Sequence, residues 1–174
     1  MTKRPNAVKF KGEDKTLVGP QLKPGDKAPA FECVTAPFTV VKLSDTPAKA
    51  RLFSVVPSLD TSVCSTQTKK FNSALNELKD KVACYTVSLD LPFAQARFCS
   101  AEAISNMQTL SDTHDHSFGQ NWGVLLEGFP FPLLTRATFV VDKNGTITHA
   151  EYVPEVTTEP NYDNAIAALR KAAG

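Results

Sequence analysis

The stretch PSLDTSVC, from Pro57 to Cys64, links a predicted strand to a predicted helix. Before it, Leu52 to Val56 has the length and the β-branched and aromatic content of a buried strand, and Pro57 ends this strand by removing a backbone donor. After it, apolar residues recur at spacings of three and four, as in an amphipathic helix: Phe71, Ala74, Leu75 and Leu78. The stretch therefore delivers a cysteine to the start of a helix.

Cys64 has two interpretations from its position alone. Asp60, Thr61 and Ser62 are good N-cap residues, and a cap at any of them puts Cys64 in the first helical turn. Unpaired backbone N–H groups and the positive end of the helix dipole favour a thiolate there. The alternative is a small buried apolar residue, which is the usual role of a free cysteine. Spacing alone leaves both open.

A longer pattern favours the reactive cysteine. The motif Pro-x-x-x-Thr-x-x-Cys, formed by Pro57, Thr61 and Cys64, resembles the active-site signature of the peroxiredoxins. Segments 63–72, 89–99 and 157–162 resemble the thiol peroxidase subfamily, so the resemblance covers most of the chain. It implies a thioredoxin-like α/β fold with a mixed central sheet flanked by helices and an N-terminal β-hairpin.

Residue patterns predict the same architecture. A second apolar strand, Val82 to Ser88, follows the Cys64 helix, so strand, helix and strand occur in βαβ order. Asn144-Gly145 lies between two strand-like runs and predicts a hairpin, and the residues after Pro160 predict a closing amphipathic helix. Asp90 is expected to cap a helix that carries Cys99.

Length and composition limit the domain organisation and the partners. A chain of 174 residues with 42% hydrophobic content suits one domain, residues 1–174, in which residues 1–20 form the hairpin extension. The formal charge of +1 and the mixed signs argue against nucleic acid or a membrane surface as a partner. No apolar region follows Met1 to Asn6 as in a secretory signal, so a cytoplasmic location is expected.

The resemblance assigns roles to four residues. Cys64 is the expected peroxidatic nucleophile, Thr61 hydrogen-bonds near its sulfur, Arg136 supplies positive charge and Pro57 shields the pocket. An arginine suits this chemistry because it stays charged and offers several fixed donors. The alternative for Arg136 is a solvated charge at a strand end, which the neighbouring signature disfavours. The alternative for Thr61 is a plain helix cap, which does not exclude a contact with the substrate.

Three other cysteines could resolve a sulfenic acid on Cys64. Cys84 lies inside an apolar strand pattern and is interpreted as core, and Cys33 has no role in the family pattern. Cys99, in Arg97-Phe98-Cys99, matches the resolving cysteine of thiol peroxidases. The resemblance therefore implies a Cys64–Cys99 disulfide within one chain, a hydroperoxide substrate, thioredoxin as the electron donor and a homodimer.

No cofactor or metal signature is visible, so the cysteines are expected to carry the electrons. His114-Asp115-His116 lies in a polar stretch and is interpreted as a solvated loop. Three rival functions remain. A disulfide reductase is disfavoured, because Gln67 stands where the Cys-x-x-Cys motif needs a cysteine. The other two are a cysteine acyl hydrolase that uses His114, His116 or His149 as its base, and a peroxide sensor that passes its disulfide to a partner.

Overall fold

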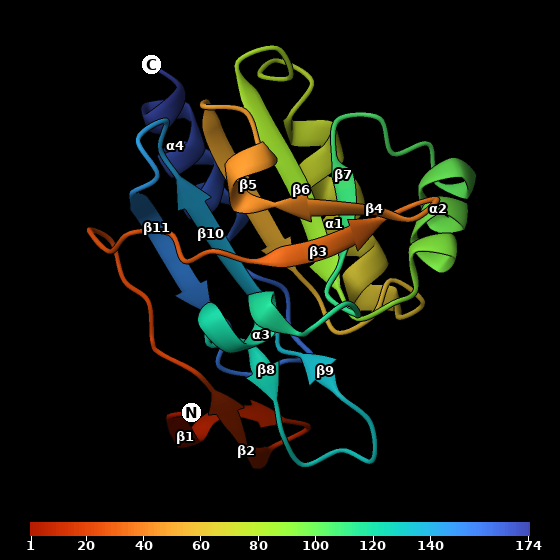
Figure 1. The fold of residues 1–174 in the computed structure, drawn as a ribbon, viewed down its shortest axis with the longest axis vertical. Helices are drawn as coiled ribbons and strands as arrows, with labels where there is room; N and C mark the ends of the chain where they lie inside the picture. Colours follow the sequence, from red (N-terminus) through yellow and green to blue (C-terminus); the bar gives the residue numbers. More distant parts are fainter.

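The computed structural model describes residues 1–174 and contains two β-sheets and four α-helices (Figure 1). In chain order the elements are β1 (Lys3–Phe10), β2 (Glu13–Val18), β3 (Glu32–Thr35), β4 (Thr39–Lys42), the 3-10 helix η1 (Leu43–Asp45), β5 (Ala50–Val55), α1 (Ser62–Ala74), β6 (Val82–Ser88), α2 (Pro92–Ala101), β7 (Gln108–Ser111), α3 (Ser117–Asn121), β8 (Leu125–Leu126), β9 (Leu133–Leu134), β10 (Ala137–Val141), β11 (Ile147–Tyr152) and α4 (Tyr162–Ala173).

The larger sheet has seven strands in the order β11-β10-β5-β6-β7-β3-β4. β5, β6 and β7 are parallel, and β10 pairs antiparallel with both β5 and β11. The predicted βαβ unit, the Asn-Gly hairpin and the closing helix are all confirmed. The mixed sheet flanked by helices is therefore the architecture that the sequence predicts.

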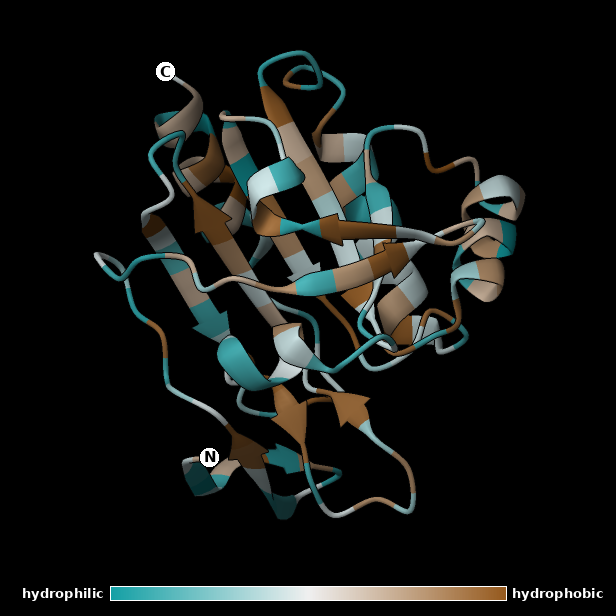
Figure 2. Ribbon diagram, in the orientation of Figure 1, coloured by the Kyte–Doolittle hydropathy of each residue, from teal (hydrophilic) through white to brown (hydrophobic).

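The central strands are buried on both faces, because their alternate residues enter two different cores. On one face, α1 and α4 pack against the sheet around Leu52, Phe71 and Leu169. On the other face, the lead-in segment and α3 cover a larger aromatic core that contains Phe53 and Trp122. Figure 2 shows apolar residues concentrated along β10 and on the short strands β8 and β9.

A second sheet, in the order β1-β2-β8-β9, stands at one end of the molecule (Figure 1). The predicted N-terminal hairpin supplies two of its strands, but the pairing of β2 with β8 was not expected. This sheet has its own small apolar core, formed by Val8, Leu17, Leu126 and Val156. The hairpin is thus packed onto the body of the protein through Val156.

Several local expectations differ from the structure. α1 ends at Ala74, so Leu78 lies in the turns that follow, although it still packs against the core. The stretch after α2 holds a strand, β7, which forms because β6 and β3 supply its hydrogen-bonding partners. Asp90 does not cap α2, whose N-cap is Leu91.

No helix is long and apolar enough to span a bilayer.

Candidate active site

Cys64 lies in the first turn of α1, as predicted, and its side chain is fully buried. Thr61 is the N-cap residue, with extended backbone angles, and its carbonyl accepts the Ser65 N–H at 3.0 Å. Val56 and Leu59 pack with Cys64 in a small cluster, and Phe98 of α2 packs against this cluster. The sulfur therefore sits at a helix N-terminus with apolar neighbours on one side.

Arg136 also contacts the sulfur, because its Nη2 donates to Cys64 Sγ at 3.4 Å. The sheet explains how residues so distant in sequence meet. Val55, at the carboxyl end of β5, pairs with Ala137, at the start of antiparallel β10. Arg136 directly precedes β10, so it lies at the sheet edge from which the chain enters α1. Arg136 is only 2% exposed, so it is not the solvated charge that the sequence allowed.

Two further hydrogen bonds fix the guanidinium plane of Arg136. Its Nε donates to the Val156 carbonyl at 2.8 Å, and its Nη1 donates to Gln67 Oε1, also at 2.8 Å. Gln67 in turn donates to Ser54 Oγ at 2.7 Å. In the sequence, Gln67 stands out only as the residue that breaks a Cys-x-x-Cys pattern. Gln67 lies three residues after Cys64, so the two side chains share one face of the helix. This spacing alone would have predicted that Gln67 lies near the sulfur.

The other two residues of the signature line the approach to α1. The Thr61 hydroxyl is exposed and donates to the Ser58 carbonyl at 2.8 Å rather than capping the helix. Pro57 is buried between β5 and this loop. A shallow cavity of about 360 Å³ opens beside the first turn of α1, lined by Ser62, Val63, Thr66, Thr157, Thr158 and Glu159.

The Asp90 carboxylate connects the two cysteine-bearing regions instead of capping α2. It accepts the Ser58 hydroxyl at 2.7 Å and the Leu59 N–H at 2.8 Å, and Ser88 Oγ also donates to it at 2.7 Å. These bonds satisfy the carboxylate more completely than a single cap bond would, which explains why the predicted cap is wrong. Asp90 therefore ties the Pro57–Cys64 loop to the start of the Cys99 helix.

Cys99 is a free, half-buried thiol on α2, which stands at the edge of the molecule (Figure 1). Burial raises the pKa of this thiol, and the neighbouring Thr109 hydroxyl on β7 partly opposes that rise. Cys64 is also free. Because Phe98 packs on the Cys64 cluster, α2 contacts the site through the residue next to Cys99.

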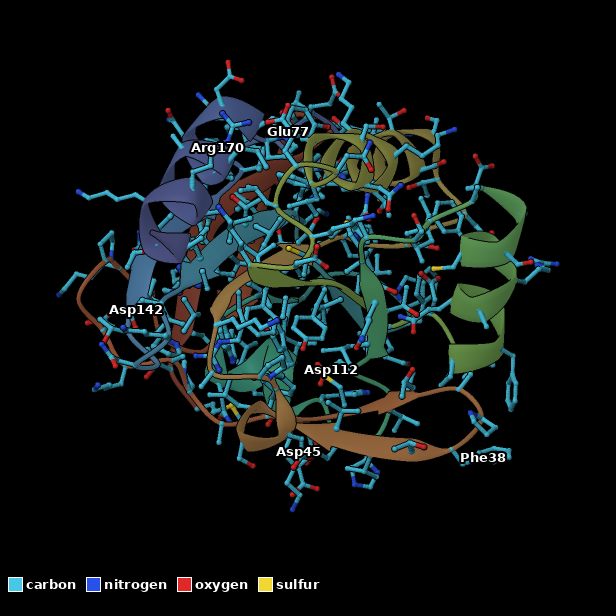
Figure 3. All side chains as sticks on the ribbon, turned by 90° about the horizontal axis from the view of Figure 1, so that it is seen from above. Phe38, Asp45, Glu77, Asp112, Asp142 and Arg170 are labelled. Atoms are coloured by element: carbon cyan, nitrogen blue, oxygen red, sulfur yellow. The ribbon has the colours of Figure 1, made fainter.

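The remaining cysteines are buried in strands. Cys84 in β6 is core, as predicted, and burial raises its pKa to about 12. Cys33 in β3 is fully buried, and burial and the Asp112 carboxylate raise its pKa still further. Asp112 points into the interior between β7 and α3 (Figure 3). Both thiols thus stay protonated at neutral pH, which makes them poor nucleophiles.

None of the three histidines hydrogen-bonds with Cys64 or Cys99. His149 Nε2 hydrogen-bonds with Thr138 Oγ1 at 3.0 Å rather than with Cys64. His114 and Asp115 do meet a third ligand-type residue, Glu32, with all three ligand atoms within 4.8 Å of one another on the surface, while His116 is not part of the group. The geometry therefore gives no support to an acyl hydrolase based on a Cys64–histidine pair.

Comparison with known proteins agrees with this arrangement. The Redoxin family model matches residues 23–166. A thiol peroxidase from Listeria innocua is 50% identical over 165 residues, which are 95% of this chain and 98% of that protein. A thiol peroxidase from Bacillus subtilis is 46% identical over 163 residues, 94% of this chain and 96% of its own length.

Solved structures give the same result. A peroxiredoxin-like protein from Aquifex aeolicus superposes with a TM-score of 0.89 at 40% identity, covering 96% of this chain and 97% of its own. A thiol peroxidase from Chromobacterium violaceum, at 18% identity, shares the fold with a TM-score of 0.84 over 94% of this chain and 95% of its own. The thioredoxin-like fold expected from the resemblance is confirmed, and the chain belongs to the Redoxin family as a peroxiredoxin-type enzyme of the thiol peroxidase group.

Proposed function

We propose that this chain reduces hydrogen peroxide and organic hydroperoxides at Cys64, that Cys99 resolves the oxidised sulfur, and that thioredoxin restores both thiols. The single observation that carries the first step is the contact between Arg136 Nη2 and Cys64 Sγ at 3.4 Å, in the first turn of α1. A guanidinium and a helix N-terminus both stabilise a thiolate, and the thiolate is the nucleophilic form of cysteine.

In the proposed first step the Cys64 thiolate attacks one oxygen of the peroxide. A sulfur–oxygen bond forms as the oxygen–oxygen bond breaks, so Cys64 becomes a sulfenic acid and the other oxygen leaves as water or alcohol after gaining a proton. The leaving oxygen gains negative charge during this step, and fixed donors aimed at such a position stabilise it. Arg136 is suited to this role because two neutral acceptors already hold its guanidinium in place.

In the proposed second step the Cys99 thiol attacks the sulfenic sulfur, a disulfide forms and water leaves. A disulfide needs the two Cα atoms within about 7 Å. Cys64 packs in its own apolar cluster, whereas Cys99 lies beside Thr109 of β7. We therefore expect α2 or the first turn of α1 to shift locally before the disulfide closes.

Single substitutions test this cycle. Cys64→Ser should abolish peroxide consumption, whereas Cys99→Ser should allow one stoichiometric oxidation and block turnover with thioredoxin. Cys84→Ser is the matched control, because Cys84 is buried in the core and should not affect turnover. Normal turnover by Cys99→Ser would show that another group resolves the sulfenic acid. Stoichiometric oxidation of the unmodified protein without turnover would instead favour the peroxide sensor.

The remaining parts of the proposal rest on the resemblance. Thioredoxin keeps thiols reduced in the cytoplasm, so a thioredoxin-dependent enzyme is expected to act there. We also propose that the chain forms a homodimer. Steady-state turnover with thioredoxin as against glutathione tests the reductant, cell fractionation tests the location, and analytical ultracentrifugation tests the oligomeric state.

A further inference from the structure

One carboxylate joins the N-terminal hairpin to the segment that follows β11. Glu155 Oε1 accepts the Lys11 N–H, and Oε2 accepts the Gly12 N–H, both at 3.0 Å. Glu155 Oε1 also accepts the Thr157 N–H at 3.1 Å and the Thr157 hydroxyl at 2.7 Å. Four donors from two separate parts of the chain therefore converge on this one side chain.

The hairpin tip is shaped to hold such an anion. Lys11 and Gly12 have φ of 50° and 83°, the two positive angles of a tight hairpin turn. Their successive N–H groups point outward from the turn and form a small concavity that suits an anion. Hydrogen bonds from Thr157, above all, and from the hairpin amides lower the pKa of Glu155 to about 2. The carboxylate is thus ionised whenever the protein is near neutral pH.

The same segment carries one of the acceptors that orient the active-site arginine. The Lys9 N–H donates to the Pro154 carbonyl at 2.7 Å, and the Val156 N–H donates to the Lys9 carbonyl at 2.8 Å. The Val156 side chain is buried in the core of the second sheet, while its carbonyl accepts Arg136 Nε at 2.8 Å. The hairpin therefore helps to set the position of that carbonyl, together with the Val153 N–H, which donates to the Arg136 carbonyl at 3.0 Å.

We propose that Glu155 is a positioning residue for the thiol peroxidase site: it holds the hairpin tip against residues 154–157 and so fixes the Val156 carbonyl that orients Arg136 toward Cys64. The physical reason is the geometry of the guanidinium, whose donors lie in one rigid plane. If the acceptor of Nε moves, the plane turns and Nη2 leaves the sulfur. The proposal rests on the proposed function and assigns a role to the hairpin in it.

Two substitutions separate the hairpin contact from the local turn. Glu155→Gln keeps the size but turns an amide N–H toward a backbone N–H. Glu155→Asp keeps the charge, and it keeps the bonds to Thr157 because an aspartate makes the same local bonds in an Asx turn. Its side chain is one methylene shorter and does not reach the hairpin amides. Glu13→Gln is the matched control, because Glu13 is an exposed hairpin carboxylate whose partner is Lys15.

The readouts are kcat/KM for hydrogen peroxide and, in a Cys99→Ser background, the ultraviolet thiolate absorbance at neutral pH. Both Glu155 variants should lose about tenfold in kcat/KM and part of the thiolate absorbance. This loss is smaller than the roughly 10²-fold cost of a 1 Å misplacement of a reacting group, because Glu155 acts through Val156 and Arg136. Glu13→Gln should match the unmodified protein. Full activity in either Glu155 variant, or a loss of rate with an unchanged thiolate signal, would overturn the proposal.

The thiolate measurement needs no peroxide, so it tests the positioning role even if the unmodified protein proves inactive as a peroxidase. Thermal unfolding of each variant identifies the folded ones. If Glu155→Gln does not fold, Glu155→Asp carries the same comparison, because it retains the charge and the local turn.

Discussion

Gln67 accepts a hydrogen bond of 2.8 Å from Nη1 of Arg136, so a residue one turn after Cys64 on α1 holds the guanidinium that faces the sulfur. Both side chains are buried, at 0% and 2% exposure. An arginine in that environment depends on its acceptors, because a buried donor left without a partner costs about 1–3 kcal/mol.

Replacing Gln67 with methionine should therefore reduce both stability and activity. The loss of its acceptor leaves Arg136 Nη1 unpartnered, which should cost about 1–3 kcal/mol in the free energy of unfolding, measured by chemical denaturation. kcat/KM for hydrogen peroxide should fall by about tenfold, less than the roughly 10²–10³ expected for a donor that contacts the reacting atoms itself. Lys69→Met, on the exposed side of α1, is the control, and an unchanged rate in Gln67→Met would contradict the prediction.

Arg136→Lys should lower kcat/KM for peroxide by about 10²–10³-fold, because an ammonium cannot reproduce three bonds in one plane. Arg51→Lys provides a matched control. Arg51 is also buried, at 5% exposure, and donates to Thr46 and to the Asp142 carbonyl, but it lies at the opposite end of β5. It should lose comparable stability and keep the peroxide rate. Equal rate losses in both variants would mean that the effect of Arg136 is on folding only.

Asp90→Asn should loosen the loop that carries the active-site signature. The amide provides one acceptor oxygen where the carboxylate accepts from Ser58, Leu59 and Ser88, so we expect a loss of about 1–3 kcal/mol in the free energy of unfolding. Amide exchange of Leu59 should accelerate by more than that of α4. Asp60→Asn is the control: Asp60 is exposed, and its contact with Arg97 is long, at 3.9 Å. Unchanged exchange at Leu59 would show that Asp90 does not restrain the loop.

Oxidation to the disulfide should change amide protection in α2 and in the first turn of α1. Neither cysteine is bonded in this structure, and Phe98 packs on the Cys64 cluster, so joining the two sulfurs should displace that contact. Comparing amide exchange of the reduced and oxidised protein measures the change, with α4 as an internal reference. Identical protection around both cysteines would count against a local rearrangement.

The stability of the protein should fall in acid partly through Glu155. Its pKa is lowered from 4.5 to about 2 by bonds from Thr157 and the hairpin amides. A carboxyl with a lowered pKa contributes stability above its unfolded-state value, and that contribution is lost as the pH falls toward its folded-state value. The difference in Tm between the unmodified protein and Glu155→Gln should therefore be largest near neutral pH and shrink between about pH 4.5 and pH 2. A difference that does not change with pH would contradict this assignment.

Exposed aromatic residues show how local patterns can mislead at the surface. Phe38, at the tip of the β3–β4 hairpin, is 77% exposed, and its ring packs edge-on against Phe93 of α2 (Figure 3). By residue type alone, a phenylalanine next to a strand or within a helix is expected to be buried. Both lie at the periphery because β4 is an edge strand and α2 stands outside the two main cores.

The strands β7, β8 and β9 could not be predicted for a related reason. β8 and β9 have two residues each, and β7 is Gln-Thr-Leu-Ser, with a single apolar residue. Such segments become strands because a neighbouring strand offers hydrogen-bonding partners, and that neighbour is distant in sequence. Asp90 also could not be assigned from local pattern, because its carboxylate accepts hydrogen bonds from Ser58 and Leu59, which are distant in sequence, and not from the adjacent helix α2.

The sequence by itself determined the elements whose pattern is local: the strands β5 and β6, the hairpin at Asn144-Gly145, the helix after Pro160, and the placement of Cys64 in the first turn of α1. Hydrophobic period and capping chemistry suffice for these, because both act over a few residues. Only the tertiary structure decided what surrounds the sulfur. The antiparallel pairing of β5 with β10 brings Arg136 to Cys64, and the packing of the N-terminal hairpin sets the carbonyl of Val156 that holds it. Those contacts depend on which strands become neighbours, and burial of the whole core determines that.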